Sequence, residues 1–153
     1  MKSKRQSKDY MFVGIQLLLF VGYLLPFSII SFQLPLIFRW IALGVGLCGI
    51  LILLLALLHL NRNLTPFPTP KADAQLITSG LYQYVRHPIY SGILAIVFGF
   101  GMYQGNFFKI IVSFLLLGLF YFKTEFEETL LAKKFENYDT YRRKTGRFWP
   151  FLK

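Results

Sequence analysis

Four long apolar runs constrain the fold of this chain more than any other feature. They cover about 11–32, 36–60, 89–103 and 107–122, and hydrophobic residues make up 55% of the 153 residues. A soluble domain averages about 45–50%. The first two runs exceed the roughly 20 residues that a helix needs to cross the hydrocarbon core of a bilayer. We therefore expect an all-α integral membrane protein, a single domain over 1–153 with about four transmembrane helices.

The two shorter runs are separated by only three residues, Gln104-Gly-Asn106, and this spacing predicts a tight helical hairpin. Its second helix is expected to continue beyond Phe122 into a cytoplasmic, helical C-terminal extension. A signal peptide over 1–31 is the alternative for the first run, but the run is too long and no small-x-small cleavage site follows it. Glycines are expected to allow close helix packing; they are Gly44, Gly46, Gly49, Gly99, Gly101 and Gly105.

Positive charge is concentrated on one side of this predicted topology. With the N-terminus inside and four alternating helices, all of the 17 Lys and Arg residues except Arg39 and Lys109 fall on the cytoplasmic side. This distribution follows the positive-inside rule and places both termini in the cytoplasm. The net charge of +10 therefore indicates contact with anionic membrane lipids rather than a nucleic-acid partner.

A cluster of polar and aromatic side chains precedes the third apolar run. Residues 78–90 read Thr-Ser-Gly-Leu-Tyr-Gln-Tyr-Val-Arg-His-Pro-Ile-Tyr, so Arg86, His87 and three tyrosines meet at the start of a membrane helix. Such groups are costly near a bilayer unless they bind something. Pro88 suits the first position of the helix. The alternating prolines of 65–70 predict an extended segment that leads along the membrane surface toward this cluster.

A second polar cluster lies at the end of the fourth run. Lys123 and Glu127 are four residues apart and share one helix face, whereas Glu125 and Glu128 are expected to point elsewhere. Taken alone, such a pair is an exposed ion pair worth roughly 0.3–0.5 kcal/mol, and the basic residues of 142–147 are a headgroup-binding surface. The two histidines and the distant single cysteine give no metal-ligand pattern.

Together the two clusters resemble the isoprenylcysteine carboxyl methyltransferase family. The resemblance covers about half of the chain, from Leu76 to the C-terminus, and its residues are Gly80-Leu-Tyr82, Arg86-His-Pro-Ile-Tyr90, Glu127-Glu128, Leu131, Phe135, Tyr141 and Gly146-Arg-Phe-Trp-Pro150. Members of this family are multi-helix membrane enzymes. They hold S-adenosylmethionine in a cytoplasmic pocket and transfer its methyl group to a lipophilic acceptor that arrives through the membrane.

The resemblance implies a cofactor site built from 74–90 and 123–150. The implied cofactor-binding residues are Gln75, Leu76, Ile77, Tyr82, His87, Pro88, Ile89, Tyr90 and Glu127. Lys123 stands where eukaryotic members carry an arginine linked to substrate binding, and lysine keeps the charge but loses the bidentate grip on a carboxylate. A second departure follows Phe135. Family members often have a glycine directly after this phenylalanine and a tyrosine four residues after it, whereas here Glu136 follows directly and Tyr138 comes three residues after Phe135.

The implied reaction needs few catalytic groups. A carboxylate acceptor is already ionised, so transfer requires alignment above all, with Lys123 holding the carboxylate. The acceptor most consistent with the family is an isoprenylcysteine-like carboxylate. A thiol or phospholipid amine would have to lose a proton, to His87 or Tyr90. The sequence also leaves open a lipid-handling reductase relative, a non-enzymatic membrane protein, and any oligomeric state.

Overall fold

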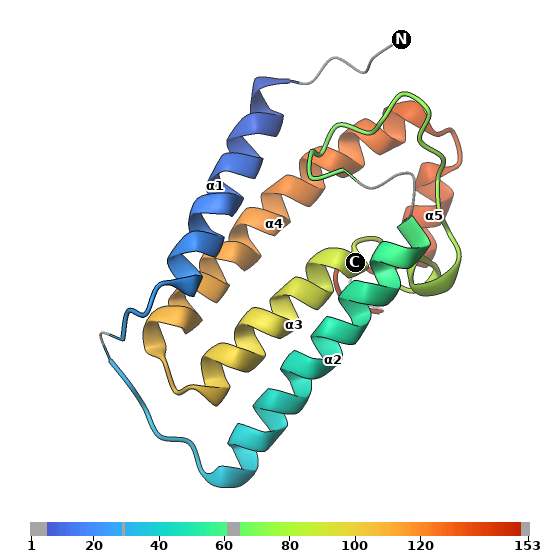
Figure 1. Ribbon diagram of the computed structural model, residues 1–153. Coiled ribbons are helices and arrows are strands. Elements are labelled where there is room, and N and C mark those ends of the chain that lie inside the picture. Colours follow the sequence, from blue (N-terminus) through green and yellow to red (C-terminus); the bar gives the residue numbers. More distant parts are fainter. Residues whose placement is uncertain (1–5, 29, 61–64, 151–153) are drawn as a thin grey trace.

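The computed structural model describes residues 6–28, 30–60 and 65–150 (Figure 1). Its helices are α1 (Ser7–Leu24), α2 (Leu36–Leu60), a short 3-10 helix η2 (Gly80–Gln83), α3 (Pro88–Tyr103), α4 (Phe107–Lys134) and α5 (Tyr138–Lys144). Within the described residues, extended pairing is limited to two isolated bridges, Ser31–Asn106 and Val85–Gly146. The prediction of an all-α chain is confirmed.

The position of α1 differs from its prediction. The apolar pattern predicted a helix over about 11–32, whereas the helix begins at Ser7 and ends at Leu24. At its start, the Asp9 carboxylate accepts a hydrogen bond from the backbone N–H of Gln6 at 2.8 Å and suits the positive end of the helix dipole. The helix ends before Pro26, because proline has no N–H to donate and disfavours helical backbone in the residue before it.

The other boundaries follow the predictions closely. α2 has the predicted bounds, α3 begins at Pro88, the residue predicted for its first position and one residue before the apolar run, and α4 continues to Lys134. In the tight turn between α3 and α4, Gly105 has a φ of +62°, a left-handed conformation that favours glycine. The segment after α1 is anchored to this turn, since Phe32 donates its backbone N–H to the Gly105 carbonyl at 2.8 Å.

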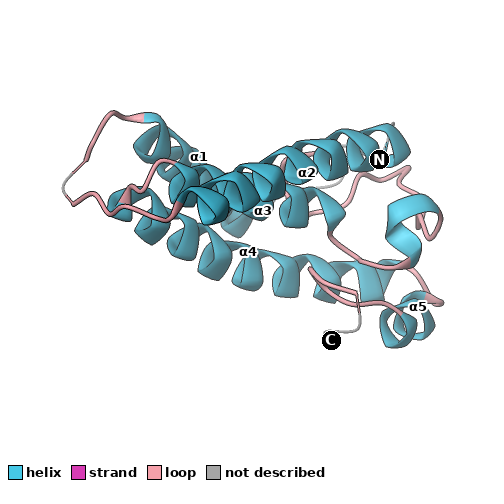
Figure 2. Cartoon of the chain, turned by 90° about the horizontal axis from the view of Figure 1, so that it is seen from below, coloured by secondary structure: helices cyan, strands magenta, loops and turns pink. Residues whose placement is uncertain are grey.

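The four long helices lie side by side in the order α1, α4, α3, α2, and neighbouring helices run in opposite directions (Figures 1 and 2). One end of the bundle therefore collects the first turns of α1 and α3 and the last turns of α2 and α4. The loop over 65–80 and α5 lie at this same end (Figure 1). The fold thus brings together the two polar clusters that the sequence separates.

Glycines set the close contact between α2 and α3. A Cβ added at Gly99 would lie 2.5 Å from the Gly46 nitrogen, and one added at Gly49 would lie 2.7 Å from the Gly92 carbonyl oxygen. These positions confirm the expected role of glycine in helix packing. Gly44 differs, because a Cβ there would have no atom within 4 Å.

We expect Gly99→Ala to lower the free energy of unfolding by about 1–3 kcal/mol, because the added methyl group forces the two backbones apart. Gly44→Ala is the matched control on the same pair of helices. It should be neutral or slightly stabilising, since alanine is favoured over glycine in a helix by about 1 kcal/mol. Denaturant unfolding of the full chain in detergent micelles compares the two. Equal changes in both variants would contradict the packing described here.

Much of the surface of the bundle is apolar. Among the described residues, α2 and α4 are long and apolar enough to cross a membrane, and α3 is a shorter apolar helix of 16 residues. α2 exposes large apolar side chains along its whole length, each more than half exposed: Leu36, Trp40, Leu47, Leu54 and Leu58. A continuous apolar surface of this kind is unfavourable in water and suits contact with lipid.

Candidate functional site

The loop before α3 is fixed against the C-terminal segment. Gly80, with a φ of +62°, turns the chain into η2. Arg86 then donates its backbone N–H to the carbonyl of Gly146 at 2.8 Å, and His87 donates in the same way to the next carbonyl at 3.1 Å. α3 begins at the following residue, Pro88. These two hydrogen bonds set the positions from which the Arg86 and His87 side chains extend.

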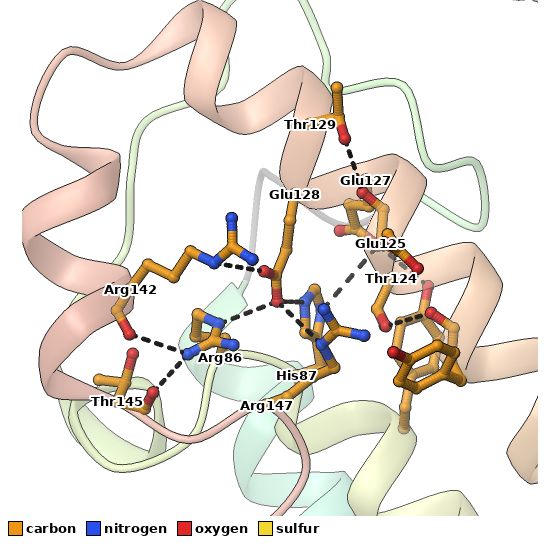
Figure 3. Close-up of polar contacts among 12 residues, drawn as sticks. Arg86, His87, Thr124, Glu125, Glu127, Glu128, Thr129, Arg142, Thr145 and Arg147 are labelled. Carbon is orange, nitrogen blue, oxygen red and sulfur yellow. Dashed lines mark hydrogen bonds and ion pairs between the residues drawn. The ribbon is translucent and has the colours of Figure 1, made fainter. Parts of the chain in front are cut away.

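A buried carboxylate, Glu128 of α4, lies at the centre of a cluster of arginine side chains (Figure 3). Its Oε1 accepts a hydrogen bond from Arg86 Nε at 2.8 Å and lies 3.1 Å from His87 Nε2. The Nε atoms of Arg142 and Arg147 lie 3.3 and 3.6 Å from the same carboxylate. The Glu128 side chain is only 2% exposed. It is therefore the central counter-charge of this end of the bundle.

Glu127 lies on the other side of the His87 ring. Its Oε2 accepts a hydrogen bond from the Tyr90 hydroxyl at 3.3 Å and lies 4.0 Å from His87 Nδ1. The expectation that Glu125 points elsewhere is met, because Glu125 is exposed. The same expectation for Glu128 was wrong. Successive helix residues differ by about 100° in direction, and the loop before α3 and the C-terminal segment cover both faces.

Lys123, one turn before Glu127, is almost fully buried, with 1% of its surface exposed. Its Nζ donates hydrogen bonds to Gln16 Oε1 of α1 at 2.6 Å and to the Pro66 carbonyl at 2.9 Å. The same atom lies 5.3 Å from the centre of the Tyr90 ring. An ammonium group has three N–H donors. Within the described residues two of these donors have hydrogen-bond partners, and the third has none.

The proline-rich segment is held over the site by α1. Thr69 donates its backbone N–H and its hydroxyl to the two carboxylate oxygens of Asp9, at 3.0 and 2.6 Å. Asp9 is fully buried, so this connection between α1 and the loop is shielded from water. Residues 61–64 at the start of the predicted loop lie outside the described residues.

Two cavities share a wall made of Leu60, Thr65, Tyr82, Arg86, His87 and Glu127. The first, of about 100 Å³, lies under the loop over 65–77, and its other lining residues include Leu131, Phe135, Tyr138 and Tyr141. The second, of about 300 Å³, extends into the bundle, and its other lining residues include Gln16, Pro66, Ile89, Tyr90, Ile93 and Lys123. The shared wall makes this a candidate site for two ligands that meet.

The residues implied by the family resemblance divide between the two cavities. Those that line only the first are Gln75, Leu76 and Ile77. Those that line only the second are Ile89, Tyr90 and Lys123. Those that line both are Tyr82, His87 and Glu127. Pro88 is buried at the start of α3 and is not a lining residue of either cavity.

Two tyrosine residues that line the first cavity differ in the hydrogen bonding of their hydroxyl groups. Tyr141 donates its hydroxyl to the Tyr82 carbonyl at 2.6 Å. The Tyr138 hydroxyl is buried and has no hydrogen-bond partner within the described part of the chain. Burial raises the pKa of both groups above the ordinary value of 10, so both remain protonated donors at neutral pH. A buried hydroxyl without a partner on a cavity wall indicates a place for a polar ligand.

The sequence interpretation missed Asp9 and Gln16 as parts of the site. A signal for each was present, because Gln16 is the only amide in the apolar run over 11–32 and Asp9 is the only acidic residue before Asp73. A lone polar side chain in an apolar helix usually faces a polar partner inside the protein. The identity of those partners, Lys123 and Thr69, required the fold.

Comparison with known proteins identifies the family of the chain. The family model for phospholipid methyltransferase matches residues 37–138, which is 102 of the 153 residues. The chain belongs to the phospholipid methyltransferase family. Over 82 residues, or 52% of its length, this family member is 35% identical to the protein-S-isoprenylcysteine O-methyltransferase of Schizosaccharomyces pombe. The match covers 35% of that relative.

A solved structure has a similar fold. It is that of the eukaryotic intramembrane Ras methyltransferase ICMT (isoprenylcysteine carboxyl methyltransferase), matched with a TM-score of 0.58 and 23% identity over 97% of this chain. The phospholipid methyltransferase family member spans 55% of that structure. At this identity the likeness establishes the fold. The predicted resemblance to isoprenylcysteine carboxyl methyltransferases is confirmed, and the chain is an integral membrane protein.

Proposed function

We propose that this chain is a membrane methyltransferase that uses S-adenosylmethionine. Its acceptor is a lipophilic, isoprenylcysteine-like molecule, and the carboxylate of this molecule receives the methyl group. The observation that carries the proposal is the wall of Tyr82, His87 and Glu127 shared by two cavities, one under a polar loop and one extending into the apolar bundle. A polar donor and a lipophilic acceptor can meet only in a site of this kind. The name of the S. pombe relative supports the acceptor class.

The residues of the first cavity fit the proposed cofactor. The unpaired Tyr138 hydroxyl offers a hydrogen bond to a polar group, Glu127 offers negative charge to a cationic group, and the Phe135 ring offers an aromatic face to a purine. When bound, S-adenosylmethionine supplies an activated methyl group on a positively charged sulfur. The residues proposed to hold it are Gln75, Leu76, Ile77, Tyr82, His87 and Glu127.

The second cavity suits the acceptor. Lys123 supplies a fixed positive charge at its inner wall, and its bonds to Gln16 and Pro66 orient the remaining N–H. Ile89 and Ile93 supply apolar lining on α3. A carboxylate held by Lys123 needs no general base, so the role of the protein is to align the two reactants and to keep water out.

His87 is proposed as a positioning residue for this alignment. Its ring lies between the two carboxylates, 3.1 Å from Glu128 and 4.0 Å from Glu127. Arg86 fixes Glu128 from the side opposite the ring (Figure 3). The position of Glu127 on the shared wall thereby depends on a chain of contacts that begins in the C-terminal segment.

A phospholipid amine is the second candidate acceptor, favoured by the description of the matching family. That reaction requires a group to accept a proton, and His87 and Tyr90 line the second cavity. The buried charge of Lys123 favours an anionic acceptor group over an amine. An assay that offers both acceptor classes to the full chain separates the two candidates.

The membrane arrangement is also proposed. Four helices cross the bilayer, with the site and both termini on the cytoplasmic side and 1–153 forming one domain. Support comes from the alternating directions of α1 to α4 and from the ten described Lys and Arg residues that the topology assigns to the cytoplasmic side: Lys8, Lys71, Arg86, Lys123, Lys133, Lys134, Arg142, Arg143, Lys144 and Arg147. Lys2, Lys4, Arg5, Arg62 and Lys153, which were counted with them, lie outside the described residues.

Binding of the cofactor tests this function. We expect Glu127→Ala and His87→Ala each to weaken S-adenosylmethionine binding by more than about tenfold, because a hydrogen bond to a charged group is worth roughly 1.5–3 kcal/mol. Isothermal calorimetry on the full chain in detergent measures the affinity. Glu125→Ala removes the same charge from an exposed position on α4 and should leave the affinity unchanged. Unchanged binding in both site variants would overturn the assignment of the site.

A further inference from the structure

A third cavity, of about 230 Å³, is lined by four arginines and one acidic residue: Arg86, Arg142, Arg143, Arg147 and Asp139. We call it the arginine cavity. Its only lining residue in common with the two cavities above is Arg86. Figure 3 shows Arg142 reaching Glu128 from the side away from Glu127. The arginine cavity therefore lies on the other side of Glu128 from Glu127 and adjoins the proposed methyl-transfer site through Arg86.

The charges around the arginine cavity do not balance. Glu128 is shared by Arg86, Arg142 and Arg147 at 2.8, 3.3 and 3.6 Å. Arg143 adds a fourth guanidinium, and Asp139 adds a second carboxylate. Among the described residues named here, four positive and two negative charges leave a net charge of +2. Uncompensated guanidinium groups around a concave surface attract an anion with several oxygen atoms.

The Arg147 guanidinium also has unused donors. Its Nε and Nη1 atoms are buried and have no hydrogen-bond partner in the described part of the chain, although Nε faces the Glu128 carboxylate at 3.6 Å. Its carbon Cζ lies 4.8 Å from the centre of the Tyr121 ring. Tyr121 is 49% exposed, as are Phe122, whose ring contacts that of Tyr121, at 64%, and Trp149, two residues after Arg147 in the sequence, at 52%. Exposed aromatic rings of this kind lie at the interface between bilayer and water, so the arginine cavity opens at the level of lipid headgroups.

We propose that the arginine cavity binds a phosphate group, carried either by an anionic lipid headgroup or by a free phosphate ion. The planar fork of arginine matches phosphate oxygens with paired hydrogen bonds. Arg142 and Arg143 are exposed at the cavity mouth, while Arg86 and Arg147 form its inner side. The bound phosphate adds the counter-charge that Glu128 and Asp139 do not supply. Arg86 is shared with the proposed methyl-transfer site, but phosphate binding here requires no methyl transfer.

The test measures binding to the full chain in detergent micelles by calorimetry, without an activity readout. The probes are inorganic phosphate, dihexanoyl phosphatidic acid and, as a lipid without net charge, dihexanoyl phosphatidylcholine. We expect saturable binding of phosphatidic acid and little binding of phosphatidylcholine. Equal affinity for inorganic phosphate assigns the site to the free ion, whereas weak phosphate binding assigns it to a lipid headgroup.

Variants distinguish a specific binding site from nonspecific attraction to positive surface charge. Arg143 has one described side-chain hydrogen bond, to Thr140 at 3.5 Å, so Arg143→Gln should fold normally. We expect it to weaken binding by about tenfold, and Arg143→Lys to fall between it and the parent chain. Lys144→Gln removes the same charge from the next residue, which does not line the arginine cavity. Equal losses in Arg143→Gln and Lys144→Gln, or no saturable binding by any probe, would overturn the proposal.

Discussion

Replacing Glu128 with alanine is expected to lower the free energy of unfolding by about 3–5 kcal/mol, the largest stability effect of any single change at this end of the bundle. Glu128 is 2% exposed, and the Arg86 side chain beside it is 3% exposed. Removal of the carboxylate leaves Arg86 and its neighbour Arg147 buried without their main counter-charge. The Arg86 guanidinium would keep its hydrogen bonds to the carbonyls of Arg142 and Thr145 but lose its counter-charge, and the Arg147 guanidinium would lose the carboxylate that it faces.

Glu125→Ala is the matched control, because it removes the same charge from the same helix at an exposed position. It should change the free energy of unfolding by less than about 0.5 kcal/mol. Glu128→Gln keeps the shape of the side chain without its charge and should fall between the two. Denaturant unfolding in detergent, followed by circular dichroism, gives the comparison. Similar stabilities for Glu128→Ala and Glu125→Ala would show that the cluster is not a stabilising one.

Much of the fold was predictable because the bilayer demands long apolar helices. The bounds of α2 follow from one long run that is apolar except for Arg39 and His59 near its ends, and the hairpin of α3 and α4 follows from Gln104-Gly-Asn106. The end of α1 was mispredicted because the chain stays mostly apolar after Leu24, although the described residues 25–28 and 30–32 are not helical. Hydropathy marks the residues that avoid water, whereas Pro26 decides where the helix stops. For the end of α1, Pro26 was therefore a better guide than the hydropathy of the residues around it.

The site was predictable in its segments and less so in its contacts. Residues within one helical turn, such as Lys123 and Glu127, can be assigned to one face from spacing alone. The partners of Lys123 and Asp9 are 107 and 60 residues away in the sequence. Glu128 was misjudged for the same reason, since the arginines that surround it come from two distant segments. The spacing of residues within one helix does not reveal which side chains from other segments will contact it.

Lys123→Ala is expected to reduce turnover by about 30- to 100-fold while the affinity for S-adenosylmethionine stays within a few-fold. A hydrogen bond to a charged group is worth roughly 1.5–3 kcal/mol, and the proposed bond to the acceptor carboxylate is lost. Lys123 lines only the second cavity, so the first keeps its walls. Steady-state kinetics with an isoprenylcysteine acceptor, together with calorimetry of cofactor binding, measures the two effects separately.

Two further variants distinguish a role in substrate binding from a role in packing, because Lys123 also bonds to Gln16 and Pro66. Gln16→Ala removes a packing partner and keeps the cation, so turnover should fall much less than in Lys123→Ala. Lys123→Arg restores a cation that can hold a carboxylate through two donors, and it should preserve turnover if the acceptor is a carboxylate. If Lys123→Ala instead loses cofactor binding and keeps normal acceptor kinetics, then Lys123 belongs to the cofactor pocket. The division of the two cavities between donor and acceptor would then have to be reversed.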